Sequence, residues 1–333
     1  MADFDTRTVW PSDISSLRRF DPRRIMQLGR DPGLGVRLLH KQGITGKGIS
    51  IGIIDQGLLV DHREYKDRLR MYEEIHCADN HSVMHGPAVV SVAAGKTVGV
   101  APEADIYYVA ETNCHMNLFG QIVFDYEPVA QALNRLLDVN AKLPKAKRMR
   151  VISLSLGWEG HFGGCSELAK AVGRAEQEGV FFVSCSLDQT YSWKPRFHGL
   201  DRDPLDDPNK PISYKPGLWW ARRFYESGGL RTSEAPRTAL RSHLAIPMGS
   251  RCTAAPTGTG DYVFYRTGGW SWCIPYIAGL YALACQVKPD VTPEEFWKAA
   301  IETGDFITVS DGKHTRRLGT IVNPPKLIER VRH

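Results

Sequence analysis

The sequence lacks any long apolar run. None of its 333 residues belongs to a segment long and apolar enough to cross a membrane, and the N-terminal stretch MADFDTRTVWPSD has no apolar signal-peptide core. These absences argue against a membrane-spanning helix in this sequence and predict no membrane partner. As the sequence stands we expect a cytoplasmic protein, with a secreted mature form as the alternative.

Cysteine is scarce as well. The chain has seven cysteines, an odd number, and Cys185, Cys273 and Cys285 fall in apolar segments. Buried free thiols explain this distribution better than a disulfide framework does. A reducing compartment is therefore expected.

The chain has little surplus of either charge. Its 42 Lys+Arg residues face 37 Asp+Glu residues, a net charge of +5. The basic residues are scattered except in residues 142–150 (KLPKAKRMR), which we interpret as a solvated connection. No interleaving of basic and aromatic residues indicates nucleic-acid binding, and no Gly-x-Gly-x-x-Gly follows the first predicted strand. These absences disfavour a nucleic-acid partner and a nucleotide-binding enzyme.

Apolar, β-branched segments alternate with helix-like ones. The predicted strands are 49–54, 104–110, 150–156 and 180–186, and the predicted helices are 86–94, 127–142 and 165–178. This alternation predicts an α/β fold, a three-layer, doubly wound and mostly parallel sheet with helices on both faces. In such sheets ligands bind at the carboxyl ends of the strands.

The domain organisation predicted from composition is simple. Residues 1–30 are expected to form an N-terminal extension on the surface, and residues 31–333 one domain. Residues 187–242 are rich in Pro, Asp and Arg and break the alternation, so we interpret them as an insertion. Leu218-Trp219-Trp220 is expected to anchor this insertion to the body.

One stretch combines a flexible loop with a possible nucleophile. In residues 269–279 (GWSWCIPYIAG), a glycine-rich loop runs into Ser271 and an apolar helix follows. Unpaired backbone N–H groups and the positive end of the helix dipole suit a nucleophile whose attack creates an oxyanion. Taken alone, Ser271 is better explained as an N-cap.

Two other polar residues change that interpretation. Asp55 ends the first predicted strand (IIDQG), and His85 opens a predicted helix (HGPAVV). The order Asp55, His85, Ser271 is that of the subtilisin triad.

These motifs resemble those of the subtilisin-like serine proteases, the subtilase family. The family's aspartate, histidine and serine motifs match residues 54–57, 85–91 and 269–279. Gly99-Val100-Ala101-Pro102 and Ser155-Leu156-Gly157 also match family signatures. The resemblance covers about residues 30–330.

The resemblance implies a serine endopeptidase acting on polypeptides through an acyl-enzyme. Ser271 is then the nucleophile, His85 the general base, and Asp55 the group that orients His85. Residues 155–157 resemble the strand edge that pairs with an extended substrate. Tyr107 matches a position lining a distant apolar subsite, although a core aromatic residue explains it equally well.

The chain departs from the family at the oxyanion donor. The family's asparagine aligns with Asp188, or with Gln189 if the register shifts by one. An ionised carboxylate cannot donate a hydrogen bond, so Asp188 would have to be protonated. Burial beside Phe182 and Leu187 is expected to raise its pKa. This departure leaves open a catalytically weak or inactive subtilase that works by binding, and the sequence does not determine the oligomeric state.

Metal ions are not expected to be required as cofactors. The calcium-holding loop that follows the histidine helix in many subtilases is missing between Ala94 and Gly99. A run of four acids could bind calcium, although a solvated loop explains it better: Asp201, Asp203, Asp206 and Asp207. Four residues of zinc-ligand type match no common zinc spacing, so zinc is not predicted: His76, Cys77, His81 and His85.

Overall fold

The computed structural model describes residues 3–12, 20–77, 83–116, 121–158, 160, 162–226 and 243–333. Its centre is a five-stranded parallel sheet in the order β3-β4-β2-β7-β8. The strands are β2 (Ser50–Asp55), β3 (Leu69–Ile75), β4 (Asp105–Glu111), β7 (Met149–Leu154) and β8 (Phe181–Ser184). Every residue of β2 is buried, as its apolar sequence predicts for a central strand covered on both faces.

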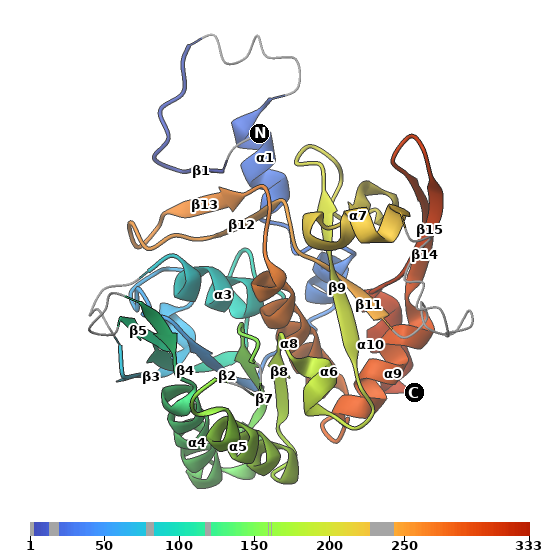
Figure 1. Ribbon diagram of the computed structural model, residues 1–333. Helices are drawn as coiled ribbons and strands as arrows, with labels where there is room; N and C mark the ends of the chain where they lie inside the picture. The colour runs from blue at the N-terminus through green and yellow to red at the C-terminus, as the bar shows by residue number, and fades with distance from the viewer. Residues whose placement is uncertain are drawn as a thin grey trace.

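Helices cover both faces of this sheet (Figure 1). On one face lie α3 (His85–Ala94) and α8 (Trp270–Val287), and on the other lie α4 (Glu127–Lys142) and α5 (Cys165–Gln177). Two hydrophobic clusters follow from this layering, one on each face of the sheet. The predicted α/β class is therefore confirmed.

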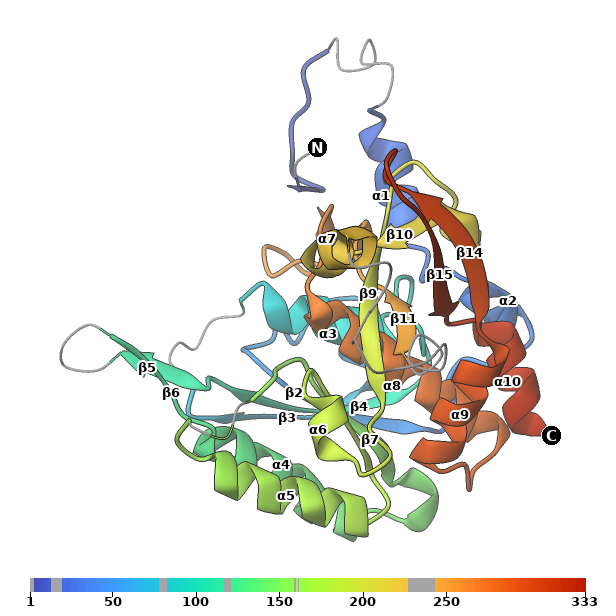
Figure 2. The same ribbon diagram turned by 45° about the vertical axis from the view of Figure 1, so that its right-hand side comes forward.

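A second five-stranded sheet has the order β10-β9-β11-β15-β14. The strands are β9 (Arg196–Arg202), β10 (Tyr214–Pro216), β11 (His243–Pro247), β14 (Asp305–Ser310) and β15 (Thr315–Ile321). The inner strands β9, β11 and β15 are parallel, and the outer two pair antiparallel with their neighbours. Helices α9 (Pro293–Thr303), α10 (Pro324–Arg332) and α2 (Val36–Lys41) lie near this sheet (Figure 2).

The region predicted as an insertion contains regular elements. Its described part forms α6 (Leu187–Thr190), β9, β10, α7 (Leu218–Glu226) and a 3-10 turn at Pro211–Ser213. Residues 227–242 lie outside the described residues. Of the predicted anchor, only Trp220 is buried, where its indole N–H donates to Gly199 O at 2.6 Å, whereas the side chain of Trp219 is exposed.

The N-terminal residues pair with a β-ribbon. Strand β1 (Phe4–Asp5) joins β13 (Tyr262–Tyr265), which in turn pairs with β12 (Arg251–Ala254). The Phe4 and Phe264 rings lie 5.3 Å apart, and α1 (Pro22–Gly29) packs beside the ribbon. The ribbon leads directly into α8, so the N-terminal segment is tied to the element that precedes Ser271 (Figure 1).

The remaining elements are short. Strands β5 (Cys114–Met116) and β6 (Ile122–Phe124) form a small hairpin, and 3-10 turns occur at Lys66–Arg68 and Lys145–Lys147. Among the described residues, no helix combines the length and apolarity needed to cross a membrane.

Candidate active site

Asp55 and His85 form a close hydrogen-bonded pair at the carboxyl edge of the central sheet. The Asp55 Oδ1 and His85 Nδ1 atoms lie 2.6 Å apart. Asp55 is the last residue of β2 and His85 the first of α3. Gly86 permits this approach, because a Cβ atom there would lie only 2.5 Å from the carbonyl oxygen of Gln56.

Burial and charge act in opposite directions on His85. Burial lowers the pKa of the imidazole, but the adjacent Asp55 carboxylate and its hydrogen bond raise it more. The net result is a pKa above the ordinary value of 6.5. The Asp55 side chain is only 4% exposed, so this pairing is poorly screened by solvent. The imidazole is thus oriented through Nδ1, which leaves Nε2 for chemistry.

Ser271 lies in the first turn of α8, next in sequence to a residue that packs on His85. The ring of the next residue, Trp272, lies edge-on to the His85 ring with the centroids 5.6 Å apart. Close packing of α8 against α3 holds this arrangement, because a Cβ atom at Gly279 would lie 2.9 Å from Ala93 O. The structure therefore brings all three predicted residues to one end of the α3–α8 pair.

The Ser271 hydroxyl donates to the backbone of Ser155. Ser271 Oγ lies 3.2 Å from Ser155 O, and Ser155 Oγ donates to Ser271 O at 2.9 Å. A hydroxyl has a single proton, so Ser271 cannot donate to His85 at the same time. In this state the serine faces the predicted substrate edge rather than the imidazole.

The segment after β7 is fixed on both sides. Leu156 O accepts from Cys185 N at 3.0 Å, and Gly157 O accepts from the Tyr126 hydroxyl at 2.9 Å. Ser155 touches Ser271, whereas the Leu156 side chain packs against the cluster beneath α4 and α5. Of the three residues of the predicted substrate edge, Ser155 is the one that the structure brings against Ser271.

The expectation of a buried Asp188 is wrong. Its side chain is 39% exposed, and Asp188 Oδ2 lies 3.5 Å from Arg196 Nε. It is the second residue of α6 and lies on the outer side of that short helix, so Phe182 and Leu187 are buried without covering it. Gln189 is exposed too. The choice between these side chains as oxyanion donor stays a prediction.

Tyr107 occupies the middle of β4, opposite Gly52, and its partly buried side chain packs against the cluster beneath α4 and α5. The choice between a subsite residue and a core aromatic residue at Tyr107 therefore stays a prediction. Its neighbour Tyr108 points the other way and donates its hydroxyl to Gln56 O, next to Asp55, because side chains alternate along a strand.

Two residues near the pair were not predicted from the sequence. Glu111 ends β4 and is 4% exposed, and burial with the nearby Asp55 charge raises its pKa to about 8. Burial raises the pKa of the Cys185 thiol to about 12, and Asp55 contributes. The signal that singled out Asp55, a polar residue at the end of a buried strand, is also present at Glu111.

The metal-ligand candidates are dispersed or already paired. Within the described residues, no group of three His, Cys, Asp or Glu side chains could hold a metal ion. His81 lies outside those residues. In the acidic run, Asp203 is paired with Lys215 and Arg266, and Asp207 with Lys210.

Comparisons with known proteins agree with the motifs. A family model, Peptidase_S8 (subtilase family), matches residues 46–216, about half of the chain, including Asp55 and His85 but ending before Ser271. The subtilisin-like protease PopC of Myxococcus xanthus (strain DK1622) is 33% identical over 313 residues. That match covers 86% of this chain but only 60% of PopC, so the chain spans less than two thirds of the length of this relative.

Two solved structures share the fold at low sequence identity. The prenylagaramide maturation protease PagA superposes with a TM-score of 0.57 at 14% identity, covering 89% of this chain and 98% of PagA. The A-subunit of an AB5 toxin from E. coli superposes with a TM-score of 0.59 at 14% identity, covering 91% of this chain and 98% of the subunit. At this identity the similarity concerns the fold alone.

Proposed function

Because this chain belongs to the subtilase family, we propose that it is a serine peptidase in which Asp55, His85 and Ser271 act as a catalytic triad. The observation that carries this proposal is the 2.6 Å bond between Asp55 and His85 beside the first turn of α8. Membership of the family supports hydrolysis by a serine protease, and the named relative agrees.

The first chemical step forms an acyl-enzyme. The Ser271 hydroxyl turns from Ser155 O toward His85 Nε2, gives up its proton and attacks the scissile carbonyl carbon. The C–N bond then breaks, and the imidazolium returns the proton to the leaving amine. A water molecule deacylates Ser271 by the same route, with His85 again taking and returning a proton.

Asp55 supports these proton transfers without moving a proton itself. It accepts from Nδ1, so the unprotonated nitrogen of neutral His85 is Nε2. When His85 becomes positively charged, the buried carboxylate stabilises that charge. The same interaction raises the pKa of His85.

The start of α8 offers a donor for the oxyanion. The backbone N–H of Ser271 has no acceptor among the described residues, whereas that of Trp272 donates to Gly269 O at 3.0 Å. A free N–H at the positive end of a helix dipole favours negative charge developing there. The side chain of Asp188 or Gln189 would supply the second hydrogen-bond donor to the oxyanion.

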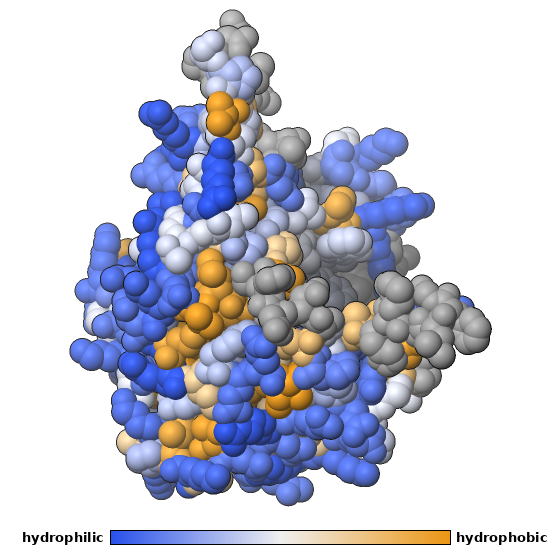
Figure 3. All heavy atoms as spheres, turned by 90° about the vertical axis from the view of Figure 1, so that its left-hand side faces the viewer, coloured by the Kyte–Doolittle hydropathy of each residue, from blue (hydrophilic) through white to orange (hydrophobic). Residues whose placement is uncertain are grey.

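The proposed substrates are polypeptides. An extended peptide would lie along Ser155, where the carbonyl that holds the Ser271 hydroxyl is the available main-chain acceptor. Exposed Met84 directly precedes His85, and exposed Val123 and Phe124 lie on β6. The left-hand face of Figure 1 gathers apolar side chains near its centre, as Figure 3 shows, which suits apolar peptide segments. We propose no cofactor for the reaction.

Two measurements test the proposal. A fluorophosphonate probe should label the parent protein and a Ser310→Ala control but not Ser271→Ala, and peptide-library hydrolysis should follow the same pattern. Loss of the nucleophile removes on the order of 10⁶ in rate. Equal turnover by Ser271→Ala and the parent would rule out the triad. If the folded parent neither labels nor hydrolyses peptides, the binding-only alternative holds.

A further inference from the structure

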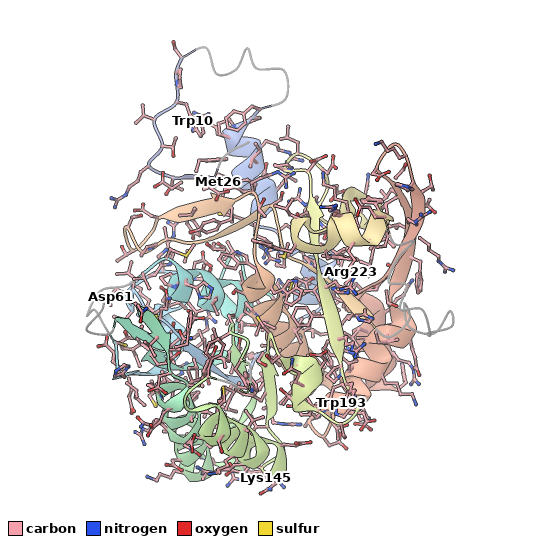
Figure 4. The ribbon with its side chains drawn as sticks, viewed as in Figure 1. Trp10, Met26, Asp61, Lys145, Trp193 and Arg223 are labelled. Carbon is pink, nitrogen blue, oxygen red and sulfur yellow. The ribbon has the colours of Figure 1, made fainter. Side chains whose placement is uncertain are left out.

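A cavity of about 910 Å³ lies at the opposite end of the central sheet from Asp55. Its wall includes Ile49 and Met149, which lie at the amino ends of β2 and β7. The turn after α5 and the segment after α8 complete it. The cavity thus opens on a face of the molecule that the proposed reaction does not use, near Lys145 at the bottom of Figure 4.

Four basic side chains line this cavity: Lys47, Lys145, Arg148 and Arg150. Three of them come from the basic run at 142–150, which the sequence analysis interpreted as a solvated connection. Lys145 and Arg148 are exposed to solvent, as that interpretation expects, but together with the partly buried Arg150 they also line this hollow.

Within the described residues none of these cations has a carboxylate partner. Arg148 donates to Ala141 O and Leu143 O, and Arg150 donates to Pro289 O and Val291 O. Backbone carbonyls orient the guanidinium groups but leave their charge uncompensated. No carboxylate of the described residues lies within ion-pair distance of Lys47 or Lys145, whereas nearby Lys147 Nζ lies 3.7 Å from Asp105 Oδ2.

The acids in the wall do not balance this charge. Glu178 already accepts from Arg174 at 2.8 Å, which leaves Asp290 as the remaining carboxylate. The unpaired charge on the wall is therefore positive. A cluster of like charges around a hollow is unfavourable when empty and raises the local concentration of anions.

The rest of the wall is mainly apolar. Ile49, Ala141, Ala146 and Pro289 contribute to it, and the volume lies within the range of small-molecule sites. An inorganic anion would satisfy the cations but leave this apolar surface in water. A ligand with one anionic group on an apolar body would satisfy both.

We infer that this cavity binds a small amphiphilic anion, a molecule that carries one carboxylate, sulfonate or phosphate group on an aryl or acyl body. The anionic group lies among Lys47, Lys145 and the two guanidinium groups, and the apolar body covers Ile49 and Ala146. The inference is independent of the proposed peptidase activity, because no residue of the cavity belongs to the triad.

Equilibrium binding of 1-anilinonaphthalene-8-sulfonate (ANS), followed by its fluorescence, tests the inference on the full chain. The parent should bind one equivalent saturably. Lys47→Glu with Lys145→Glu should weaken binding about tenfold or more, because each reversal replaces an attraction for the sulfonate by a repulsion. Lys96→Glu with Lys313→Glu changes the net charge equally at exposed sites elsewhere and should alter binding less than about twofold.

Competition experiments distinguish the contribution of the anionic group of the ligand from that of its apolar body. Decanoate should displace ANS, whereas decanol and inorganic phosphate at matched ionic strength should displace it poorly. Equal displacement by decanol would overturn the role of the cations, and equal displacement by phosphate would overturn the role of the apolar wall.

A third variant tests location without changing charge. Ala146→Trp places a large side chain at the cavity wall and should abolish saturable binding, while the circular dichroism spectrum and melting temperature confirm that the variant folds. Absence of saturable binding by the parent, or unchanged binding by Ala146→Trp, would rule out this cavity as the site.

Discussion

Glu111 ends β4 one residue beyond the position that pairs with Asp55, the last residue of the neighbouring strand β2. Two carboxyl groups therefore end neighbouring strands at this edge of the sheet, and the charge of Asp55 acts on Glu111. Asp55 has His85 as its partner, whereas Glu111 Oε2 is buried with no partner among the described residues. A carboxyl group in that position is far more favourable protonated than ionised.

This relationship predicts that Glu111 destabilises the fold as the pH rises. Burial, with the Asp55 charge, raises its folded pKa to about 8, above the unfolded value of 4.5. Between these values the unfolded chain has lost a proton that the native state keeps, so stability falls by roughly 1.4 kcal/mol per pH unit. Glu111→Gln should remove this slope, and should be more stable than the parent at pH 8.

Urea unfolding at pH 5, 6.5 and 8 measures the slope. Glu294→Gln is the matched control, because Glu294 is exposed on the first turn of α9. The control should retain the parent's pH dependence. A Glu111→Gln variant with the parent's slope would show that Glu111 does not keep its proton in the native state.

The acid limit of activity should reflect the raised pKa of His85. The imidazole must be neutral to take the proton of Ser271, and Asp55 keeps it protonated to a higher pH than usual. The rate should therefore fall as the pH drops through a value above 6.5, rather than at or below it. The measurement is kcat/KM on one chromogenic peptide from pH 5 to 9.

The Asp55→Asn variant tests whether Asp55 is the cause of this acid limit of activity. The amide cannot stabilise the imidazolium, so the rate should fall by on the order of 10⁴ and the acid limb of the residual activity should move to lower pH. An unchanged limb would mean that a group other than His85 sets it. Thermal melting of the variant checks that the fold survives.

Much of the central sheet could be predicted because its strands are continuous apolar runs. Strand β2 was expected at 49–54 and lies at 50–55. As predicted, Asp55 ends this strand, His85 begins α3, and Ser271 lies in the first turn of α8. Such short-range signals are strong where one strand is buried on both faces. They placed the triad candidates at element ends without any knowledge of packing.

Strand β9 could not be predicted in this way because its sequence, RFHGLDR, is polar. Arg202 is nonetheless only 2% exposed. Its guanidinium group donates to the backbone carbonyls of Asp203, Pro204 and Ser250. Only the folded chain brings these three acceptors together around one side chain. A buried charge satisfied by the backbone leaves no apolar pattern, so the region looked like an insertion.

The direction in which a side chain points was the other feature that could not be predicted from the sequence. Tyr107 and Tyr108 are adjacent in one strand, and the sequence does not say which of them faces the helix layer with α3. Asp188 was expected to be buried because its neighbours are apolar, but a four-residue helix turns it toward Arg196. In both cases the sequence leaves open the face of an element rather than the element itself.

Metal removal should have little effect on stability. The segment that replaces the usual calcium loop is held by Glu64, whose carboxylate accepts from Thr97 N at 2.7 Å and from Thr97 Oγ1. We expect EDTA to shift the melting temperature by less than about 2 °C, because only a ligand that binds the native state stabilises it. A larger drop that calcium reverses and magnesium does not would contradict this expectation.

The last prediction concerns the oxyanion and the ion pair at Asp188. A carboxylate at the donor position repels the developing oxyanion, and the pairing with Arg196 at 3.5 Å offsets part of that charge. Asp188→Asn replaces an acceptor with a donor and should raise kcat, with an upper limit of about 10²–10³. Arg196→Ala leaves the carboxylate unpaired and should lower kcat, whereas in the Asp188→Asn background the same change should have little effect. Single-turnover acylation by a peptide ester measures all four proteins. If Arg196→Ala has the same effect in both backgrounds, the pair does not act on the oxyanion. If Asp188→Asn changes nothing while Gln189→Ala lowers the rate severely, Gln189 is the donor.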